Sequence, residues 1–391
     1  MEMSLKKQPG WHEYFSLPVM CSALVSFLCL PVFQTARAQN FESWKYMRTI
    51  EPQQYICYRS PGAVEIDGRL DDPSWKAAPW TNYFVDIEGS RKQPPRFMTR
   101  AKMLWDKYYF YIGAELEEPH VWGTLLFHDQ VICRENDFEI FIDPNADNHE
   151  YYEIEIGPLN TTWELFLKKP YKDFSPGMSA DTTWDIPGMK TAVYVDGTIN
   201  DPRDTDRGWS VEFAIPWSVL AEYAHKPCPP ENGDMWRVNF SRVEVVHEIV
   251  TADYTPQDRT NNAYRRKEGI PEDNWVWSPQ GVINMHCPEK WGYVRFSAST
   301  GDHEEFRPDF TAPARTVLLD IYYAQRDFHT AHNRWASSLT DLGLDYRGST
   351  FLTRAPVLEI TAEGYRAAIS YSTTDGKSGT LTISQDSRIG E

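Results

Sequence analysis

The stretch 136–163 constrains the fold of this chain more than any other part of the sequence. Apolar side chains occupy every second position over residues 137–142 and again over residues 151–156. Such strict alternation is typical of β-strands that place one face on a core and the other face outward. We therefore expect a β-hairpin whose outward positions carry mostly carboxylates, with a turn between the strands that is rich in oxygen ligands.

Short runs of this kind recur from residue 63 to about residue 299, and turn signals rich in Gly, Pro and Asp separate them. Helical stretches are few and short in this part of the chain. This pattern predicts a mainly β fold, an antiparallel β-sandwich of the immunoglobulin-like or jelly-roll style. The expected strands cover 99–105, 108–116, 137–142, 151–156, 162–168, 190–195, 209–215, 236–246 and 292–299.

The pattern changes after Gly301. Apolar residues then recur at spacings of three and four, which predicts an amphipathic helix carrying Val317, Ile321, Ala324, Phe328, Ala331 and Trp335. Three short strands follow, at 357–361, 366–371 and 380–384. We predict a signal peptide at 1–38, a lead-in segment at 39–60, a β-sandwich at 61–300, a linker at 301–312 and a small α+β module of unknown role at 313–391.

The N-terminus has the pattern of a signal peptide. Lys6 and Lys7 precede an apolar run over 17–33, and Ala-Arg-Ala stands before Gln39. The run is short for a membrane span, although an uncleaved anchor is the alternative. We therefore predict an exported protein, periplasmic or at the cell surface or beyond it, with no membrane span after signal removal.

Four cysteines remain after the predicted cleavage site: Cys57, Cys133, Cys228 and Cys287. In an exported chain they could form two disulfides, with three possible connectivities, or remain buried thiols. None has the CxxC spacing of a zinc site.

The charge and aromatic content narrow the classes of ligand. The formal net charge is −17, which disfavours a nucleic-acid backbone as partner because that binding needs Lys and Arg against phosphates. The chain contains 15 Trp, 21 Tyr and 19 Phe residues. Exposed aromatic rings of this kind can stack on the C–H face of a sugar.

Six sequence blocks in a fixed order resemble carbohydrate-binding module family 9, in the variety common as exported proteins of Bacteroidetes. The blocks are IDGRLDDPSW, MLWDKYYFYIGAEL, NDFEIFIDPNADNHEYYEIEI, GWSVEFAIPW, GDMWRVNFSRVE and WVWSPQG with KWGYVRF. The resemblance covers about residues 60–298. It implies a sandwich that grips the end of an oligosaccharide or polysaccharide between two tryptophans, a structural calcium ion and a role in polysaccharide catabolism. The family is distantly related to DOMON domains, some of which bind haem.

The resemblance also implies site residues. Trp122 follows a strand end and matches one of the two stacking tryptophans, and Trp277, with Trp275 as the alternative, stands where the other is expected. The residues predicted to hydrogen-bond the sugar at the edge of the slot are Arg134, Asp137, Glu139 and Asn274.

Oxygen-bearing side chains alternate in the turn DPNADN. Asp143, Asn145 and Asp147 could present several oxygens to one calcium ion, since hard divalent cations take six to eight oxygen ligands. The alternative is that these side chains cap their own turn. A second acidic loop at 200–206 leaves the same two possibilities open, and no organic cofactor is expected.

No common catalytic motif occurs, and with 56 acidic residues a pair of carboxylates by itself indicates nothing. We therefore predict no catalytic residue and no enzymatic activity. Two other functions remain open. One is a structural, assembly or surface-display protein that binds a protein partner through its C-terminal module. The other is a DOMON-like redox domain whose haem would be held by a pair from Met103, His120, His128, Met285 and His286.

Overall fold

The computed structural model describes residues 40–173, 180–251, 263–301 and 304–391, and the predicted signal peptide lies outside these residues. The helices are α2 (Phe41–Met47), α3 (Pro73–Ala77), α4 (Trp217–Leu220) and α5 (Ala312–His332), with 3-10 turns η2 (Gly89–Arg91), η3 (Ile132–Arg134), η4 (Tyr171–Asp173) and η6 (Pro288–Lys290). The strands are β1 (Gln54–Arg59), β2 (Val85–Asp86), β3 (Thr99–Trp105), β4 (Tyr109–Glu117), β5 (Phe138–Asp143), β6 (Tyr151–Ile156), β7 (Thr162–Leu167), β8 (Lys190–Asp196), β9 (Gly208–Pro216), β10 (Met235–Glu244), β11 (His247–Ile249), β12 (Tyr264–Arg266), β13 (Asp273–Val276), β14 (Gly292–Ser297), β15 (Val357–Ile360), β16 (Tyr365–Ser372), β17 (Ser378–Ser384) and β18 (Ile389–Gly390).

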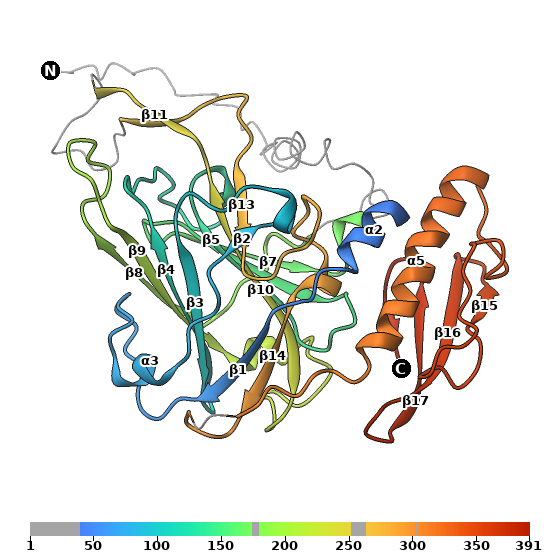
Figure 1. Ribbon diagram of the computed structural model, residues 1–391. Coiled ribbons are helices and arrows are strands. Elements are labelled where there is room, and N and C mark those ends of the chain that lie inside the picture. The colour runs from blue at the N-terminus through green and yellow to red at the C-terminus, as the bar shows by residue number, and fades with distance from the viewer. Residues whose placement is uncertain (1–39, 174–179, 252–262, 302–303) are drawn as a thin grey trace, which may run out of the picture. The chain divides into compact units, whose positions relative to one another are not determined.

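Twelve strands of the described chain form one continuous hydrogen-bonded sheet (Figure 1). Its order is β7-β6-β5-β10-β14-β1-β3-β4-β9-β8, while β13 pairs with β10 and β2 pairs with β13. The sheet curls so that β5 and β10 face β4 and β9 across a shared apolar core. For example, the ring of Phe138 on β5 lies 6.3 Å from the ring of Phe213 on β9. The predicted mainly β sandwich is therefore confirmed.

Strand β1 joins the two halves of the sheet. It runs parallel to β14 on one side and parallel to β3 on the other, whereas the other pairings in this sheet are antiparallel. Residues 54–59 belong to the segment that we expected to precede the sandwich, so the sheet begins before residue 61. The pairing of β1 with β14 joins residues far apart in the sequence, which local periodicity does not reveal.

The motif IDGRLDDPSW is held by one buried carboxylate. Glu212 on β9 accepts hydrogen bonds from the backbone N–H groups of Asp67 (2.8 Å) and Gly68 (2.6 Å) and from Nε1 of Trp75. Gly68 has φ +86°, and a Cβ there would lie 2.5 Å from the backbone nitrogen of Tyr194. Only glycine fits this turn, which is packed against β8. Burial raises the pKa of Glu212 to about 7.

The outward face of the β5–β6 hairpin is buried, so the prediction that it faces solvent is wrong. Phe141 and Tyr151 on this face pack with Val276, Met285 and Trp291 in a second apolar cluster. Met285 and Trp291 come from the segment that links β13 to β14, and Val276 is the last residue of β13. Alternation shows that a strand has two different faces, but it does not show which distant segment covers the second face.

The C-terminal residues form a four-stranded antiparallel sheet in the order β15-β16-β17-β18, with α5 packed on β16 and β17. The expected helix and its three strands are therefore present. The helix ends at His332 because Asn333 adopts a left-handed conformation with φ 52°, so Trp335 lies beyond the helix. Helix α2 also packs on α5, and Nε1 of Trp44 donates to Asp320 at 2.7 Å.

Two further observations concern export. Within the residues that the structure describes, no helix has both the length and the apolar character needed to cross a membrane. No disulfide joins the four cysteines of the described residues: Cys57 and Cys287 are buried, as the thiol alternative expects, whereas Cys133 and Cys228 are half-buried.

We predict that Gly292→Ala destabilises the sandwich while Gly62→Ala does not. A Cβ at position 292 would lie 2.4 Å from the ring of Trp277, whereas the nearest atom to a Cβ at position 62 is Oγ of Ser74 at 3.6 Å. Overpacking of this kind costs about 1–3 kcal/mol. Urea unfolding of both variants measures the difference. Equal midpoints for Gly292→Ala and the wild type would contradict the packing described for Trp277.

Candidate functional site

Trp122 lies in the loop after β4 and is covered by an aromatic side chain. Its ring stacks on Tyr264 of β12, with 6.1 Å between ring centroids and 14° between planes, and His247 contacts it at 6.0 Å. Only 2% of Trp122 is exposed. Its Nε1 is buried and has no hydrogen-bond partner among the described residues. Tyr264 thus covers the face of the Trp122 ring on which a sugar would stack.

Trp277 lies in the main core rather than in a slot opposite Trp122. Its ring packs 5.8 Å from Phe240 and 6.4 Å from Tyr55, and 1% of the residue is exposed. The side chain turns into the space between the two layers of the sandwich. The expected pair of stacking tryptophans therefore does not form an open slot in this structure. The alternative, Trp275, is 3% exposed.

The other predicted site residues gather near Trp122, and Val243 on β10 connects them. Val243 packs in the same apolar cluster as Trp122, pairs with Asn274 of β13, and donates its backbone N–H to Oδ1 of Asp137 at 3.2 Å. Arg134 is exposed at the end of η3, and its carbonyl oxygen accepts a hydrogen bond from Arg266 of β12. Their roles in binding carbohydrate remain predictions.

Three carboxylates converge beside this group. Asp137, Glu139 and Glu155 each place an oxygen within 4.8 Å of the others, and all three residues are buried. Glu139 lies directly across the β5–β6 ladder from Glu155. Burial is the main reason that the pKa of Asp137 is well above its usual range and that of Glu139 is raised to about 7.

Glu155 was not among the predicted site residues. The available signal was the register of the hairpin, since outward positions on paired strands lie opposite one another. That register depends on the length of the turn, and the seven-residue turn after β5 left it open.

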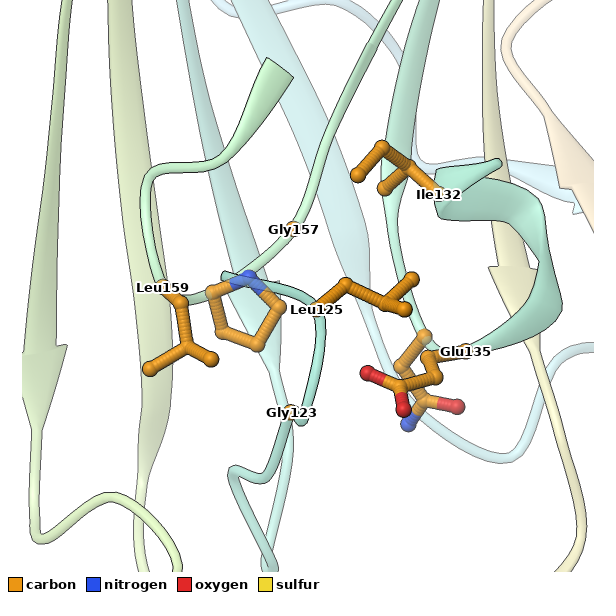
Figure 2. A pocket seen from close by; sticks show the side chains of 8 residues that line it. Gly123, Leu125, Ile132, Glu135, Gly157 and Leu159 are labelled. Atoms are coloured by element: carbon orange, nitrogen blue, oxygen red, sulfur yellow. The ribbon is translucent and has the colours of Figure 1, made fainter. Parts of the chain in front are cut away.

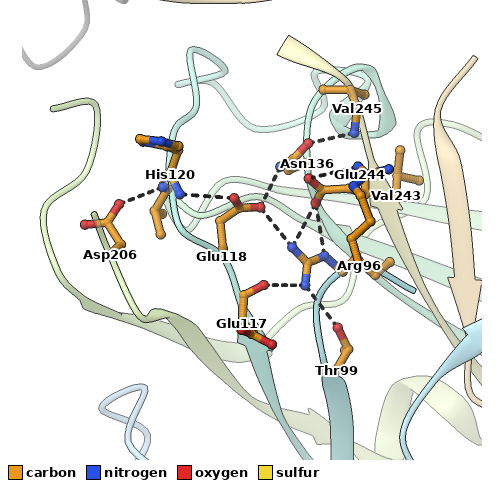
Figure 3. A network of polar contacts seen from close by, with 12 residues as sticks. Arg96, Thr99, Glu117, Glu118, His120, Asn136, Asp206, Val243, Glu244 and Val245 are labelled. Carbon is orange, nitrogen blue, oxygen red and sulfur yellow. Dashed lines mark hydrogen bonds and ion pairs between the residues drawn. The ribbon is translucent and has the colours of Figure 1, made fainter. Parts of the chain in front are cut away.

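A buried ionic network closes the same end of the sandwich (Figure 3). Arg242 on β10 donates to the carboxylates of Glu118 (2.9 Å) and Glu244 (2.8 Å), to Oγ1 of Thr99 and to the carbonyl oxygen of Glu117. One guanidinium thus faces two carboxylates at a buried site. Burial and the nearby Glu244 raise the pKa of Glu118 to about 8.

A shallow recess lies beside the network, between the loop after β4 and the turn after β6 (Figure 2). Its apolar lining includes Leu125, Ile132 and Leu159, and Glu135 lies at its edge. Its volume is about 10 Å³, which admits about one water molecule. A sugar ring would therefore need a wider opening than this recess offers.

The oxygens of the DPNADN turn bond to the turn itself. Asp143 accepts from the N–H groups of Ala146 and Asn148, Asn145 accepts from the N–H of Asp147, and Asp147 accepts from that of His149. These contacts are those of a self-capping turn. Calcium at Asp143, Asn145 and Asp147 stays a prediction. In the second acidic loop, Asp206 likewise accepts from the N–H groups of Val121 and Thr198.

The five residues considered for haem are dispersed. Met103 lies in the main core and Met285 in the cluster on the outer face of the hairpin. His120 hydrogen-bonds Tyr264, while His128 and His286 pair with Glu164 and Tyr151 respectively. Each histidine therefore has a polar partner in the protein.

The fold described above is a β-sandwich with buried polar groups at its strand ends. Residues 66–230 match the family model described as "Carbohydrate family 9 binding domain-like". The chain therefore carries a family 9-like carbohydrate-binding domain, as its sequence blocks predict. β10 and β14 lie beyond the matched span, but they belong to the same sheet.

Two curated relatives match part of this chain. The exoglucanase XynX of Acetivibrio thermocellus is 27% identical over 163 residues, and endo-1,4-beta-xylanase A of Thermoanaerobacterium saccharolyticum is 27% identical over 160 residues. Each match covers 41% of this chain but only 12% and 11% of those enzymes. This chain thus spans about an eighth or less of the length of the curated relatives it matches.

Two solved structures are similar to part of this chain. A putative carbohydrate-binding protein from Bacteroides uniformis matches 63% of this chain and all of its own, with 14% identity and a TM-score of 0.45. A family 9 carbohydrate-binding module from Caldicellulosiruptor kristjanssonii, solved in complex with cellotriose, matches 65% of this chain and all of its own, with 18% identity and a TM-score of 0.38.

We predict that Glu118→Gln reduces the loss of stability that the wild type shows as the pH rises. The pKa of Glu118 is about 8 in the folded protein against an ordinary value of 4.5, so the folded state keeps a proton that the unfolded state releases between these values. Stability therefore falls as the pH rises through that window, by an amount on the order of 1–3 kcal/mol for this group.

The measurement is urea unfolding of the wild type and the variant between pH 5 and pH 8.5. Glu117→Gln is the matched control, because Glu117 is exposed and contacts Arg242 only through its carbonyl oxygen. Parallel pH profiles for the wild type and Glu118→Gln would show that Glu118 is already ionised in the folded protein.

Proposed function

We propose that this chain is an exported, non-catalytic carbohydrate-binding protein. The observation that carries the proposal is the match of residues 66–230 to a family of carbohydrate-binding domains. The signal-peptide pattern of residues 1–38 supports export, and a role in polysaccharide breakdown belongs to the same proposal. The names of the curated relatives point to glucans and xylans, so cello- and xylo-oligosaccharides are the first ligands to test.

We place the site where β4 and β10 end and β13 begins, around Trp122. Aromatic rings supply area for stacking on a sugar, and polar side chains supply direction. Trp122 supplies the stacking ring, and the rings of Tyr264 and His247 cover it at 6.1 Å and 6.0 Å. The exposed Arg134 and the half-buried Asn274 provide polar groups beside them. Trp277 is not part of the proposed surface because it packs in the core.

We propose a non-catalytic protein because of the geometry of the carboxylates near the site. Glycoside hydrolysis needs two carboxyl groups on either side of an accessible glycosidic bond. The oxygens of Asp137, Glu139 and Glu155 lie within 4.8 Å of one another and are buried on one side of the sheet. This arrangement does not flank a bond from two sides.

We predict that Trp122→Ala weakens oligosaccharide binding by about tenfold or more, since stacking interactions of this kind contribute about 1–2 kcal/mol. Isothermal titration with cello- and xylo-oligosaccharides measures the affinity. Trp80→Ala is the control, because Trp80 is a half-buried tryptophan covered by Arg100 on the outer face of β3. Unchanged affinity in Trp122→Ala, with binding in the wild type, would move the site elsewhere.

We predict the opposite effect for Tyr264→Ala. Removing this ring uncovers the stacked face of Trp122, so the affinity for sugar rises and the quenching of tryptophan fluorescence by sugar increases. Tyr264→Phe keeps the ring and removes only the hydroxyl that bonds His120, so it serves as the matched control. If Tyr264→Ala binds sugar more weakly than Tyr264→Phe, then Tyr264 itself is a stacking surface rather than a cover.

A further inference from the structure

Four side chains with metal-binding groups meet beside β7, a terminal strand of the large sheet. They are His128, Asp129, Glu164 and Asp185, and each can place one ligand atom within 4.8 Å of the other three. Glu164 lies in β7, and Asp185 lies in the segment between β7 and β8. The two others lie in the loop after β4. The group therefore joins three segments of the chain, and it contains a nitrogen ligand as well as carboxylates.

The imidazole of His128 stands between the three carboxylates. Nε2 lies 2.8 Å from Oε2 of Glu164 and 3.5 Å from Oδ1 of Asp185. On the other side of the ring, Nδ1 lies 3.4 Å from Oδ2 of Asp129. Among the described residues, no other basic side chain comes within ion-pair distance of these carboxylates. Three acidic groups facing one imidazole leave a net negative charge even when that imidazole is protonated.

Glu164 is the member of the group that indicates a missing ligand. Its side chain is 1% exposed, whereas that of His128 is 49% exposed. Oε2 contacts His128, but Oε1 is buried and has no hydrogen-bond partner in the part of the chain that the structure describes. Burial raises the pKa of Glu164, and the nearby hydroxyl of Thr162 offsets only part of this effect. A buried carboxylate oxygen without a donor is costly, and a bound cation would relieve that cost.

The fold holds these side chains in place without an ion. The N–H of Asp129 donates to the carbonyl oxygen of Thr162 at 3.2 Å, which ties the loop after β4 to β7. Asp185 stands between Trp184, which packs against the main core, and Ile186, which is buried in it. The ligand atoms are thus positioned by a strand and by two segments that are attached to the sandwich.

We propose that Nε2 of His128 and the carboxylates of Glu164 and Asp185 bind a zinc ion, with water in the fourth position. Zinc takes nitrogen from His and oxygen from Asp or Glu in a tetrahedral arrangement, with ligand atoms about 3.4 Å apart. The 3.5 Å between Nε2 and Asp185 matches this spacing. Glu164 moves slightly outward when the ion takes the place of the proton between it and the imidazole. Metal-bound histidines usually direct their other N–H to a carboxylate, and Asp129 stands at that position.

The nitrogen ligand separates this site from the calcium predicted for the turn after β5. Calcium and magnesium take oxygen ligands, whereas imidazole suits zinc and other transition metals. Asp143 in that turn accepts from the N–H groups of its own turn. The zinc site is also independent of carbohydrate binding, since zinc binding can be measured without sugar.

The test titrates zinc chloride into the mature full-length chain, stripped with chelator and freed of any affinity tag, and follows the heat by calorimetry. We expect saturable binding of one zinc ion and a rise in the melting temperature, neither of which an excess of calcium chloride suppresses. His128→Gln and Glu164→Gln each remove a ligand and should weaken binding by about tenfold or more. Cobalt(II), whose visible spectrum reports tetrahedral coordination, gives a second readout.

His225→Gln is the matched control. The side chain of His225 is 49% exposed, as that of His128 is, and it also pairs with one carboxylate, Oε2 of Glu150 at 2.9 Å. It belongs to no group of three potential ligands among the described residues, so His225→Gln should bind zinc as the wild type does. Melting temperatures without zinc confirm that each variant is folded.

Three results would overturn the proposal. The first is zinc binding that persists undiminished in His128→Gln. The second is binding in the wild type only at millimolar zinc, which is the behaviour of an adventitious ion only. The third is displacement of zinc by an equal concentration of calcium, because a site with an imidazole ligand should prefer zinc.

Discussion

Burial of both faces of the β5–β6 hairpin is the constraint on which the rest of this structure depends. The inner face supplies Phe138, Ile140 and Ile154 to the core between the layers. The outer face is covered by the segment that links β13 to β14, with Trp291 at its centre. A hairpin covered on both sides cannot shift its register without moving apolar residues on one face and carboxylates on the other. The acidic groups of the outer face are therefore kept in fixed positions.

The ends of β4 and β10, which lie near this hairpin, carry a buried network of hydrogen bonds and ion pairs around Arg242. Arg242 connects β10 to the end of β4 through Glu118 and Glu117, and it contacts β3 through Thr99. Arg242 bonds both acids and Arg96 lies 3.9 Å from Glu244, so burial and repulsion from Glu244 are what raise the pKa of Glu118. The network fixes the start of the loop that carries Trp122, and thus the position of the proposed stacking surface.

The aromatic surface of this chain differs from the slot that its family resemblance implies. One expected tryptophan packs in the core, and the other is stacked against Tyr264 of a hairpin that follows β10. The family match supports carbohydrate as the class of ligand, but it does not determine how the rings are arranged.

The sequence by itself determined the class of fold, most strand positions, the C-terminal helix and the family, because each depends on periodicity or on ordered local motifs. Tertiary structure alone decided four other features. These are the insertion of β1 between β14 and β3, the burial of the acidic face, the position of Trp277 in the core, and the meeting of Glu155 with Asp137. Each depends on contact between segments far apart in the chain. Alternation shows that a strand has two faces, but only the folded chain shows what covers each face.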